Sequence, residues 1–445
     1  MGKILVKHAR IITMNKNEDI LTGDLLIDGD RIAKIAPFID DPTVDKVIDA
    51  TGKTVIPGFI QTHIHLCQAL FRGKADDLEL MDWLRERIWP LEAAHDKDSV
   101  YISAMLGTGE LIAGGSTTIV DMETVHHTNA AFEAIDKSGI RALSGKVMMD
   151  KGADVPAGLQ EKTDASIQES VDLLEKWNGR DNGRIRYAFA PRFVISCTEQ
   201  LLVQVRDLAN HYGVFVHTHA SENRGEIAIV ERDTGMRNIV YLDHIGLAGK
   251  HLILAHCIWL TEEEKEIIRK RGVHVSHCPG SNLKLASGIA AVPQMTGMGI
   301  NMGLGADGAP CNNNLDMFNE MRLAALIHKP ANGPTAMNAR QVFRMATIDG
   351  ARAVGMEDQI GSLEPGKKAD LAILNLNHFH CRPSFGTDPV SQIVYSAISS
   401  DVETTIIDGK MVMENRQMKT MDKALILKES EQAIDRLMKR TGISI

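Results

Sequence analysis

The sequence has little of what marks a membrane, secreted or nucleic-acid-binding protein. No window of it reaches the roughly 18 uninterrupted apolar residues that a membrane span needs. Its opening stretch, Met1-Gly-Lys-Ile-Leu-Val-Lys, lacks the apolar core and the small-residue cleavage site of a secretion signal. The net charge of −9 disfavours a nucleic-acid partner, which a basic patch would normally bind. We therefore expect a cytoplasmic protein that contacts neither membranes nor nucleic acid.

Paired cysteines are missing as well. The six cysteines (67, 197, 257, 278, 311 and 381) are scattered, and no two of them form a Cys-x-x-Cys pair. This disfavours a disulfide framework and a zinc site built from four cysteines. We expect most of them to be small buried hydrophobic residues.

What remains is the composition of an ordinary globular protein. Hydrophobic residues make up 44% and charged residues 24% of the 445 residues. A chain of this length can form one large domain and a smaller one. The composition suits an enzyme that acts on small molecules. It also permits a homodimer or larger oligomer without fixing the number of subunits.

The two ends of the chain share a sequence pattern that is typical of β-strands. Residues 1–56 are predicted to form short strands separated by turns, with Asp28-Gly29 as a hairpin signal. Similar strands return within residues 361–420, where Asp408-Gly409 again separates two apolar runs. We therefore expect a small composite β-sandwich built from both termini. The last segment, 421–445, is predicted to form a closing amphipathic helix.

The middle of the chain, residues 57–360, alternates short apolar strands with longer helical segments. This pattern predicts an α/β fold, a (β/α)8 TIM barrel. The eight expected strands are Ile60–His65, Thr117–Asp121, Ala142–Val147, Ile185–Ala190, Val214–His219, Leu252–His256, Val273–His277 and Ile300–Gly305. Seven of the eight end at or next to His, Asp or Arg, and the active site of this fold lies at the carboxyl ends of its strands.

Histidines are spaced as metal ligands on two of these strands. His63 and His65 share one face of the strand. The apolar run before them predicts that this strand is buried, where solvated histidines are not expected. His217 and His219 end the fifth strand. Glu222 follows three residues after His219 and is placed to move protons. His217 lies one layer deeper than His219, and we expect it to be a hydrogen-bonded interior residue.

Asp307 closes the eighth strand, where a carboxylate can bind a metal and accept a proton from water. A buried Asp is rare without a charged partner. His256 and His277 end the sixth and seventh strands. Three imidazole nitrogens and one carboxylate oxygen suit one Zn²⁺ per chain, and Fe²⁺ remains open.

Five stretches of the chain together resemble the amidohydrolase superfamily. They are Pro57–His65, His219–Glu222, Ala255–Cys257, Ser276–Leu285 and Gly305–Gly308. A further stretch, Gly361–Leu371, resembles the segment in which chains of this family pass from the barrel back into the composite β-sandwich. The resemblance implies a metal held by His63, His65, His219 and Asp307. It implies that Glu222, His256 and Asp307 are catalytic, moving protons and orienting the hydroxide or the leaving group.

The number of metals is a separate question. Binuclear relatives bridge two metals with a modified lysine, for which Lys146 is available. The His219-x-x-Glu222 pattern instead resembles the mononuclear deaminases, and we favour that alternative. The other zinc deaminase design is absent, because Pro310-Cys311 has no second cysteine three positions further on.

Two further resemblances narrow the range of candidate substrates. Asp307–Ala324, Leu70–Leu78 and Asn282–Ala290 resemble the 5'-methylthioadenosine/S-adenosylhomocysteine deaminases. That resemblance implies that Glu92 holds the ribose hydroxyls and that Trp83 lines the pocket, with Asn282 as a further substrate contact. We therefore favour deamination of a 5'-modified adenosine, including 5'-deoxyadenosine, to the inosine analogue and ammonia.

A guanine deaminase is the first alternative. Pro191–Phe193, Ser196–Glu199 and Gln68 resemble that family, in which such a Gln and Arg grip a free purine. Arg192 also stands where adenosine-type enzymes usually carry a His. Two structural alternatives stay open: Gln68 as a helix cap, and Arg192 as a partner of Glu222 or Asp121. The triazine hydrolases are the third candidate.

Overall fold

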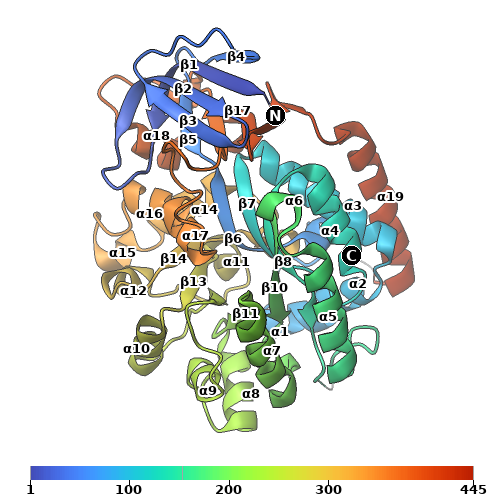
Figure 1. The fold of residues 1–445 in the computed structure, drawn as a ribbon. Coiled ribbons are helices and arrows are strands. Elements are labelled where there is room, and N and C mark those ends of the chain that lie inside the picture. The colour runs from blue at the N-terminus through green and yellow to red at the C-terminus, as the bar shows by residue number, and fades with distance from the viewer. Residues whose placement is uncertain (1, 153, 444–445) are drawn as a thin grey trace.

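The computed structural model describes residues 2–152 and 154–443, and a closed parallel barrel forms its centre (Figure 1). Within those residues eight strands follow one another round the barrel, and pairing between β10 and β11 completes the ring. They are β6 (Phe59–His65), β7 (Ser116–Met122), β8 (Arg141–Gly145), β10 (Ile185–Pro191), β11 (Phe215–Ala220), β12 (Leu252–His256), β13 (His274–His277) and β14 (Met302–Leu304). Each coincides with an expected strand, so the prediction of a (β/α)8 barrel is confirmed.

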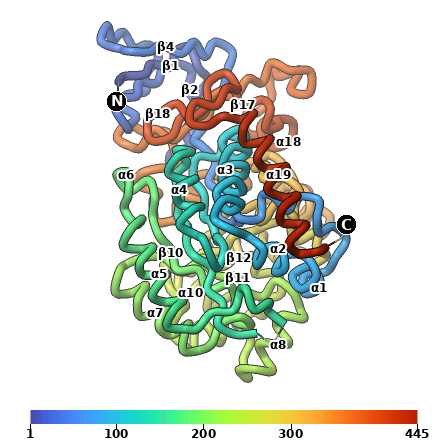
Figure 2. Tube along the Cα trace, turned by 90° about the vertical axis from the view of Figure 1, so that its right-hand side faces the viewer, coloured from blue at the N-terminus to red at the C-terminus, as the bar shows by residue number. Residues whose placement is uncertain are grey.

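Helices follow the strands and surround the barrel (Figures 1 and 2). The longer ones are α3 (Lys97–Ala113), α4 (Thr128–Ser138), α5 (Thr163–Trp177), α7 (Glu199–Tyr212), α8 (Arg224–Thr234), α9 (Asn238–His244), α10 (Glu262–Arg271), α14 (Met317–Leu326), α16 (Ala339–Met345) and α18 (Pro389–Tyr395). Their ends are locally encoded. In α10, for example, Thr261 and Glu264 form a capping box, and Gly272 ends the helix with a φ of 69°.

Nearly every residue of the barrel strands is buried. Every residue of β6, β7 and β11 is buried, including the polar residues near their carboxyl ends. Parallel strands are covered by helices outside and by side chains inside, so polar groups survive there only where they have partners or a function. The fold therefore gathers buried polar side chains at one end of the barrel.

Strands from both ends of the chain form a second sheet above the barrel (Figure 1). Its nine described strands are β1 (Lys3–Ile12), β2 (Ile20–Asp28), β3 (Arg31–Ala36), β4 (Lys46–Asp49), β5 (Thr54–Pro57), β16 (Leu371–Leu374), β17 (Val402–Ile407), β18 (Lys410–Glu414) and β19 (Gln417–Met418). Strand β5 joins the two ends, because it pairs in parallel with β1 and antiparallel with β16. The expected β-domain built from both termini is confirmed.

The two Asp-Gly signals are both turns, and they touch. Gly29 has a φ of 62° in the β2–β3 turn, and Asp408 and Gly409 have φ values of 52° and 73° in the β17–β18 turn. Two residues with positive φ are typical of the hairpin turn that Asp-Gly favours. A Cβ added to Gly409 would lie 2.0 Å from the carbonyl oxygen of Gly29, so this contact requires glycine.

The closing helix α19 (Lys423–Thr441) begins at Asp422, whose side chain accepts from the amide of Leu425. It lies along α3 on the outside of the barrel (Figure 2). Among the described residues, no helix is both long and apolar enough to cross a membrane.

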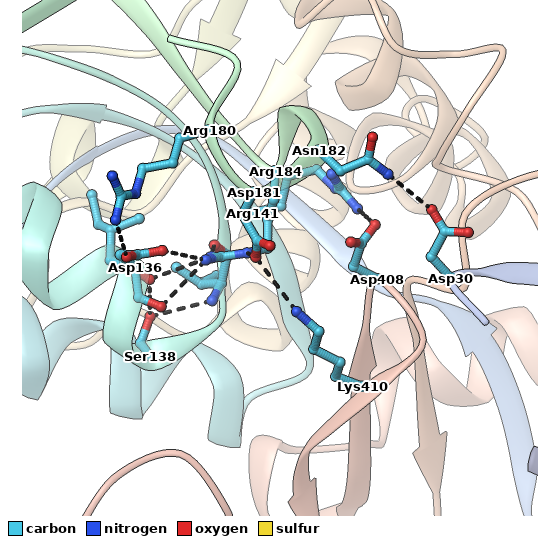
Figure 3. A network of polar contacts seen from close by, with 12 residues as sticks. Asp30, Asp136, Ser138, Arg141, Arg180, Asp181, Asn182, Arg184, Asp408 and Lys410 are labelled. Carbon is cyan, nitrogen blue, oxygen red and sulfur yellow. Dashed lines mark hydrogen bonds and ion pairs between the residues drawn. The ribbon is translucent and has the colours of Figure 1, made fainter. Parts of the chain in front are cut away.

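Buried ions connect the barrel with the sheet. Arg141, the first residue of β8, donates to both carboxylate oxygens of Asp370 at 2.7 and 3.0 Å and to Asp408 at 3.0 Å. Lys368 lies 2.9 Å from Asp408. Figure 3 shows Arg141 and Asp408 beside further contacts between the two parts, such as the pair of Lys410 with Asp181. All four residues of the inner cluster are 3% exposed or less.

We predict that Arg141→Met lowers the free energy of unfolding by about 3–5 kcal/mol, because Asp370 then stays buried without its cation and Asp408 keeps Lys368 alone. Urea unfolding followed by circular dichroism measures the loss. Arg180→Met is the matched control, since Arg180 is half-exposed and pairs with Asp136 at 3.4 Å. The control is expected to cost about 1 kcal/mol or less. Equal losses in the two variants would contradict a special role for the buried cluster.

Candidate active site

The four expected metal ligands meet at the carboxyl ends of the barrel strands. His63 and His65 come from β6, His219 from β11, and Asp307 from the two-residue strand β15 (Asp307–Gly308). Asp307 Oδ1 lies 3.3 Å from Nε2 of both His63 and His65, and His65 Nε2 lies 3.3 Å from His219 Nε2. All four side chains are buried.

Hydrogen bonds fix which nitrogen carries the proton in two of these histidines, His65 and His219. Nδ1 of His65 is 2.7 Å from the carbonyl oxygen of Met122, and Nδ1 of His219 is 2.7 Å from that of Arg192. A carbonyl oxygen only accepts, so Nδ1 must donate and Nε2 is left with a bare lone pair. His63 Nδ1 lies 3.0 Å from His217 Nε2, which confirms the interior, hydrogen-bonded position expected for His217.

The electrostatics of this cluster call for a cation. Burial lowers the pKa of His63 and His219, and it lowers that of His65 to about 3, so the imidazoles are neutral. Neutral lone pairs and a carboxylate then face one another at 3.3 Å, which is repulsive unless a positive ion lies between them. Within the described residues His63 Nε2 has no hydrogen-bond partner. The donor set therefore fits a divalent metal, with its outer hydrogen bonds already in place.

Glu222 and His256 lie beside this cluster. His256 Nε2 is 3.5 Å from Glu222 Oε2 and 3.8 Å from Asp307 Oδ2, and its Nδ1 donates to Asn282 Oδ1 at 2.9 Å. Burial raises the pKa of Glu222 to about 7. Burial opposes the charged form of His256, but the carboxylates of Glu222 and Asp307 outweigh it and raise its pKa. Near neutral pH the two side chains can therefore hold and exchange a proton.

The backbone at three strand ends is left-handed. Ser221, His256 and Asp307 have φ values of 55°, 72° and 62°, a conformation that non-glycine residues rarely adopt. Each such residue costs on the order of 1–3 kcal/mol and persists only where its surroundings enforce it. The sequence carries no signal for these conformations, which occur at or beside the site residues.

Two serines were missed by the sequence analysis. Ser281, in α11 (Pro279–Lys284), donates to Asp307 Oδ2 at 2.7 Å. Ser287 donates to Glu222 Oε1 at 3.3 Å. Ser281 lies in one of the family-like stretches, directly before Asn282, so its hydroxyl could have been singled out. Ser287 follows no strand end, and only the folded structure places it at the site.

The candidate substrate residues Gln68, Glu92 and Arg192 form one buried assembly. Arg192 donates to both oxygens of Glu92, at 2.5 and 3.2 Å, and Gln68 Nε2 donates to Glu92 Oε1 at 2.8 Å. The structural alternative that paired Arg192 with Glu222 or Asp121 is therefore wrong. Gln68 lies inside the short helix η1 (Leu66–Phe71) and donates to Glu92, so it does not cap that helix.

The carboxyl group of Glu92 is ionised, and most of its hydrogen-bond acceptor positions are occupied. Burial would raise its pKa, but Arg192 and Gln68 hold the pKa below its ordinary value. A carboxylate has about four acceptor positions, and three are used here. Among the described residues, Gln68 Oε1 and Arg192 Nε are buried without a hydrogen-bond partner. The assembly thus offers a substrate one donor and only a few acceptor positions.

The remaining candidates lie in different surroundings. Trp83 is buried in α1 (Leu80–Trp83), and its indole N–H has no partner within the described residues. Asn282 orients His256 through its oxygen and keeps its amide nitrogen unpaired in the same set of residues. Lys146 donates to Glu161 at 2.6 Å and lies 3.6 Å from Glu169, and these two carboxylates disfavour a bridging role for it.

Fold and site together define a class: (β/α)8-barrel proteins whose strand ends present histidines and an aspartate to a divalent cation, with a carboxyl–imidazole pair beside them. The chain belongs to the Amidohydrolase family, which matches residues 54–412. The family resemblance inferred from the sequence is confirmed.

Individual relatives match over nearly the whole chain. The chain is 43% identical over 435 residues to a 5'-deoxyadenosine deaminase of Methanobrevibacter smithii, covering 98% of each chain. It is 41% identical over 416 residues to a 5-methylthioadenosine/S-adenosylhomocysteine deaminase of Thermococcus onnurineus, covering 93% of this chain and 95% of the relative. A zinc-bound adenosine deaminase structure from Xanthomonas campestris superimposes with a TM-score of 0.91 at 32% identity, covering 98% of each chain.

We predict that Arg192→Met lowers the free energy of unfolding by about 3–5 kcal/mol, because the carboxylate of Glu92 then remains buried without its cation. Glu92→Gln in the same chain removes that charge, and the double variant should regain a large part of the loss. Urea unfolding of wild type, both single variants and the double variant measures the coupling. Additive losses would contradict the ion pair.

Proposed function

We propose that this protein is a hydrolytic deaminase of 5'-modified adenosines: 5'-deoxyadenosine, 5'-methylthioadenosine and S-adenosylhomocysteine. The products are the inosine analogue and ammonia. The observation that carries the proposal is the Glu222–His256 pair beside a cluster of bare histidine lone pairs and Asp307. The full-length similarity to deaminases of these nucleosides supports the substrate class.

The proposed cofactor is one Zn²⁺ per chain, with Fe²⁺ as the alternative. Nitrogens of His63, His65 and His219 and an oxygen of Asp307 would hold it. When bound, such a cation supplies Lewis acidity that lowers the pKa of a coordinated water toward neutrality. The hydrogen bonds at Nδ1 of the histidines would keep the opposite ring nitrogens available to hold the cation.

Three side chains move the protons. Water adds to C6 of the purine, and Glu222 carries one of the water's protons to the adjacent ring nitrogen, N1, as C6 becomes tetrahedral. Asp307 and His256, 3.8 Å apart, hold the new hydroxyl and pass its proton to the amino group. The C6–N bond then breaks, ammonia leaves and the C6 carbonyl forms, so both protons of the water are used. Asn282 keeps His256 oriented throughout.

Glu92 is the proposed ribose anchor, and Trp83 the proposed pocket wall. Because Arg192 and Gln68 already occupy three of the acceptor positions of Glu92, one hydroxyl can bind without displacing them. Arg192 Nε and Gln68 Oε1 would then meet the purine or the second hydroxyl.

Guanine or 8-oxoguanine deamination is the second candidate. It is favoured by Arg192 Nε and Gln68 Oε1, a buried donor and acceptor that have no partner within the described residues and could hydrogen-bond to the edge of a free purine. A triazine hydrolase is the third candidate, and it has no specific contact in its favour.

A substrate panel tests the choice. We predict that zinc-loaded protein releases ammonia from 5'-deoxyadenosine, methylthioadenosine and S-adenosylhomocysteine with kcat/KM roughly tenfold or more above guanine, 8-oxoguanine and atrazine, since the ribose supplies contacts that a free base lacks. Adenosine is the control for the 5' position. A preference for guanine would instead assign the pocket to Gln68 and Arg192.

We predict that Glu222→Gln keeps its bound metal but lowers kcat by about 10²–10⁴-fold, because the amide cannot carry the proton to the ring. Ammonia release gives kcat, and elemental analysis gives the metal content. Glu263→Gln on the exposed side of α10 is the matched control and should behave as wild type. Near-normal turnover of Glu222→Gln would remove Glu222 from its assigned role.

A further inference from the structure

We propose a second metal site, formed by His378, His380, Cys381 and Asp401 and suited to a thiophilic divalent cation such as Zn²⁺. These residues lie where the chain leaves β16 and where it enters β17, in the sheet built from both termini. The site is independent of the proposed deaminase activity. None of its residues belongs to the barrel mouth, the cluster of His63, His65, His219 and Asp307 at the carboxyl ends of the barrel strands.

The donor atoms already lie at distances that suit one ion. Asp401 Oδ2 is 2.9 Å from His380 Nε2 and 3.8 Å from Cys381 Sγ, and Asp401 Oδ1 is 3.8 Å from His378 Nε2. The donor atoms of His380, Cys381 and Asp401 all lie within 4.8 Å of one another. Ligands of a tetrahedral zinc ion are separated by roughly 3.3–3.8 Å, given metal–ligand bonds of about 2.0–2.3 Å. Small side-chain rotations would therefore close the site.

The two histidines are arranged as a pair. The rings of His378 and His380 are stacked, with centroids 5.7 Å apart and an angle of 7° between their planes. Each presents Nε2 to a different oxygen of Asp401. This is the His-x-His spacing already seen at His63 and His65, here with His378 directly before the short helix η4 (Phe379–Cys381) and His380 inside it.

Asp401 is a buried carboxylate that lies beside two histidines. Its side chain is 1% exposed, and its ion pairs among the described residues are with His378 and His380. The guanidinium of Arg416 instead donates to carbonyl oxygens, including that of Ser399, and Arg382 donates to Asn377. A buried carboxylate is stabilised by a full positive charge, and a divalent cation held by these side chains would supply one.

The donors are held in place and can be reached from solvent. Gln392, in α18, donates to the carbonyl oxygen of Cys381 at 2.6 Å, and the amide of Ile398 donates to Asp401 Oδ2 at 3.0 Å. The side chains of His378 and His380 are 45% and 39% exposed and border a surface cavity of about 570 Å³. A cation could enter there, while Cys381 and Asp401 lie buried beneath.

Binding would replace a proton with a metal bond. The Cys381 thiol loses its proton to solvent as the sulfur–metal bond forms, and the cation gains a charge-neutralising pair in Asp401 and the thiolate. The result would fasten the segment after β16 to the start of β17. Because none of these ligands belongs to the candidate active site, the effect should be on stability and metal content, and catalysis should be unaffected.

Cobalt is the probe of choice. The full-length protein, stripped with a chelator and reloaded with Co²⁺, is expected to bind two ions per chain and to show the near-ultraviolet thiolate-to-cobalt charge-transfer band. The donors at the barrel mouth are histidines and an aspartate, so they produce no such band. Cys381→Ser should lose the band and weaken binding of the second ion tenfold or more, with unchanged deaminase activity.

Two further variants complete the test. Cys197→Ser is the matched control, since Cys197 is also buried and donates to the carbonyl oxygen of Met148, and it should keep the band. His380→Gln should also weaken the second ion tenfold or more, and it serves in place of Cys381→Ser if that variant does not fold. A wild type without the band, or a band that persists in Cys381→Ser or is undiminished in His380→Gln, would overturn the proposal.

Discussion

Two backbone carbonyls decide what the barrel mouth can bind. The carbonyl oxygens of Met122, at the end of β7, and of Arg192, just after β10, each take the Nδ1 proton of a histidine on a neighbouring strand. The remaining nitrogen of each ring must then present a lone pair to the centre. These contacts exist only if β6 pairs with β7 and β10 with β11 in the observed register. The chemistry of the site thus depends on strand pairing, which the buried apolar residues of the barrel enforce.

The strands and the four candidate ligands could be predicted because they depend on short-range pattern. His63 and His65 share a face by their spacing alone, and Asp307 follows an apolar run that must be buried. The pairing of Arg192 with Glu92 could not be predicted from the sequence, because the two residues lie 100 positions apart and the geometry of the whole barrel brings them together. The left-handed backbone of His256 is also invisible in the sequence, because its cause is tertiary.

The pairing of Glu92 and Arg192 changes how substrate choice should be understood. Gln68 and Arg192 resemble one enzyme family and Glu92 another, which makes them look like rival binding sites in the sequence. In the fold they share hydrogen bonds on one carboxylate. A substitution of any one of these three residues alters the charge and the unpaired donors around the other two. Substrate specificity is therefore a property of the hydrogen-bond network as a whole, and it cannot be divided among the three side chains.

The position of β5 has a consequence for synthesis on the ribosome. One of its edges pairs with β1 as soon as the first strands emerge, but its other edge waits for β16, which follows after the entire barrel. At ordinary translation rates this delay is roughly 15 to 60 s. During that time an unpaired strand edge is open to other chains. A nascent chain of this architecture therefore needs a quickly folding barrel, or a chaperone, to shield β5 until its final neighbour arrives.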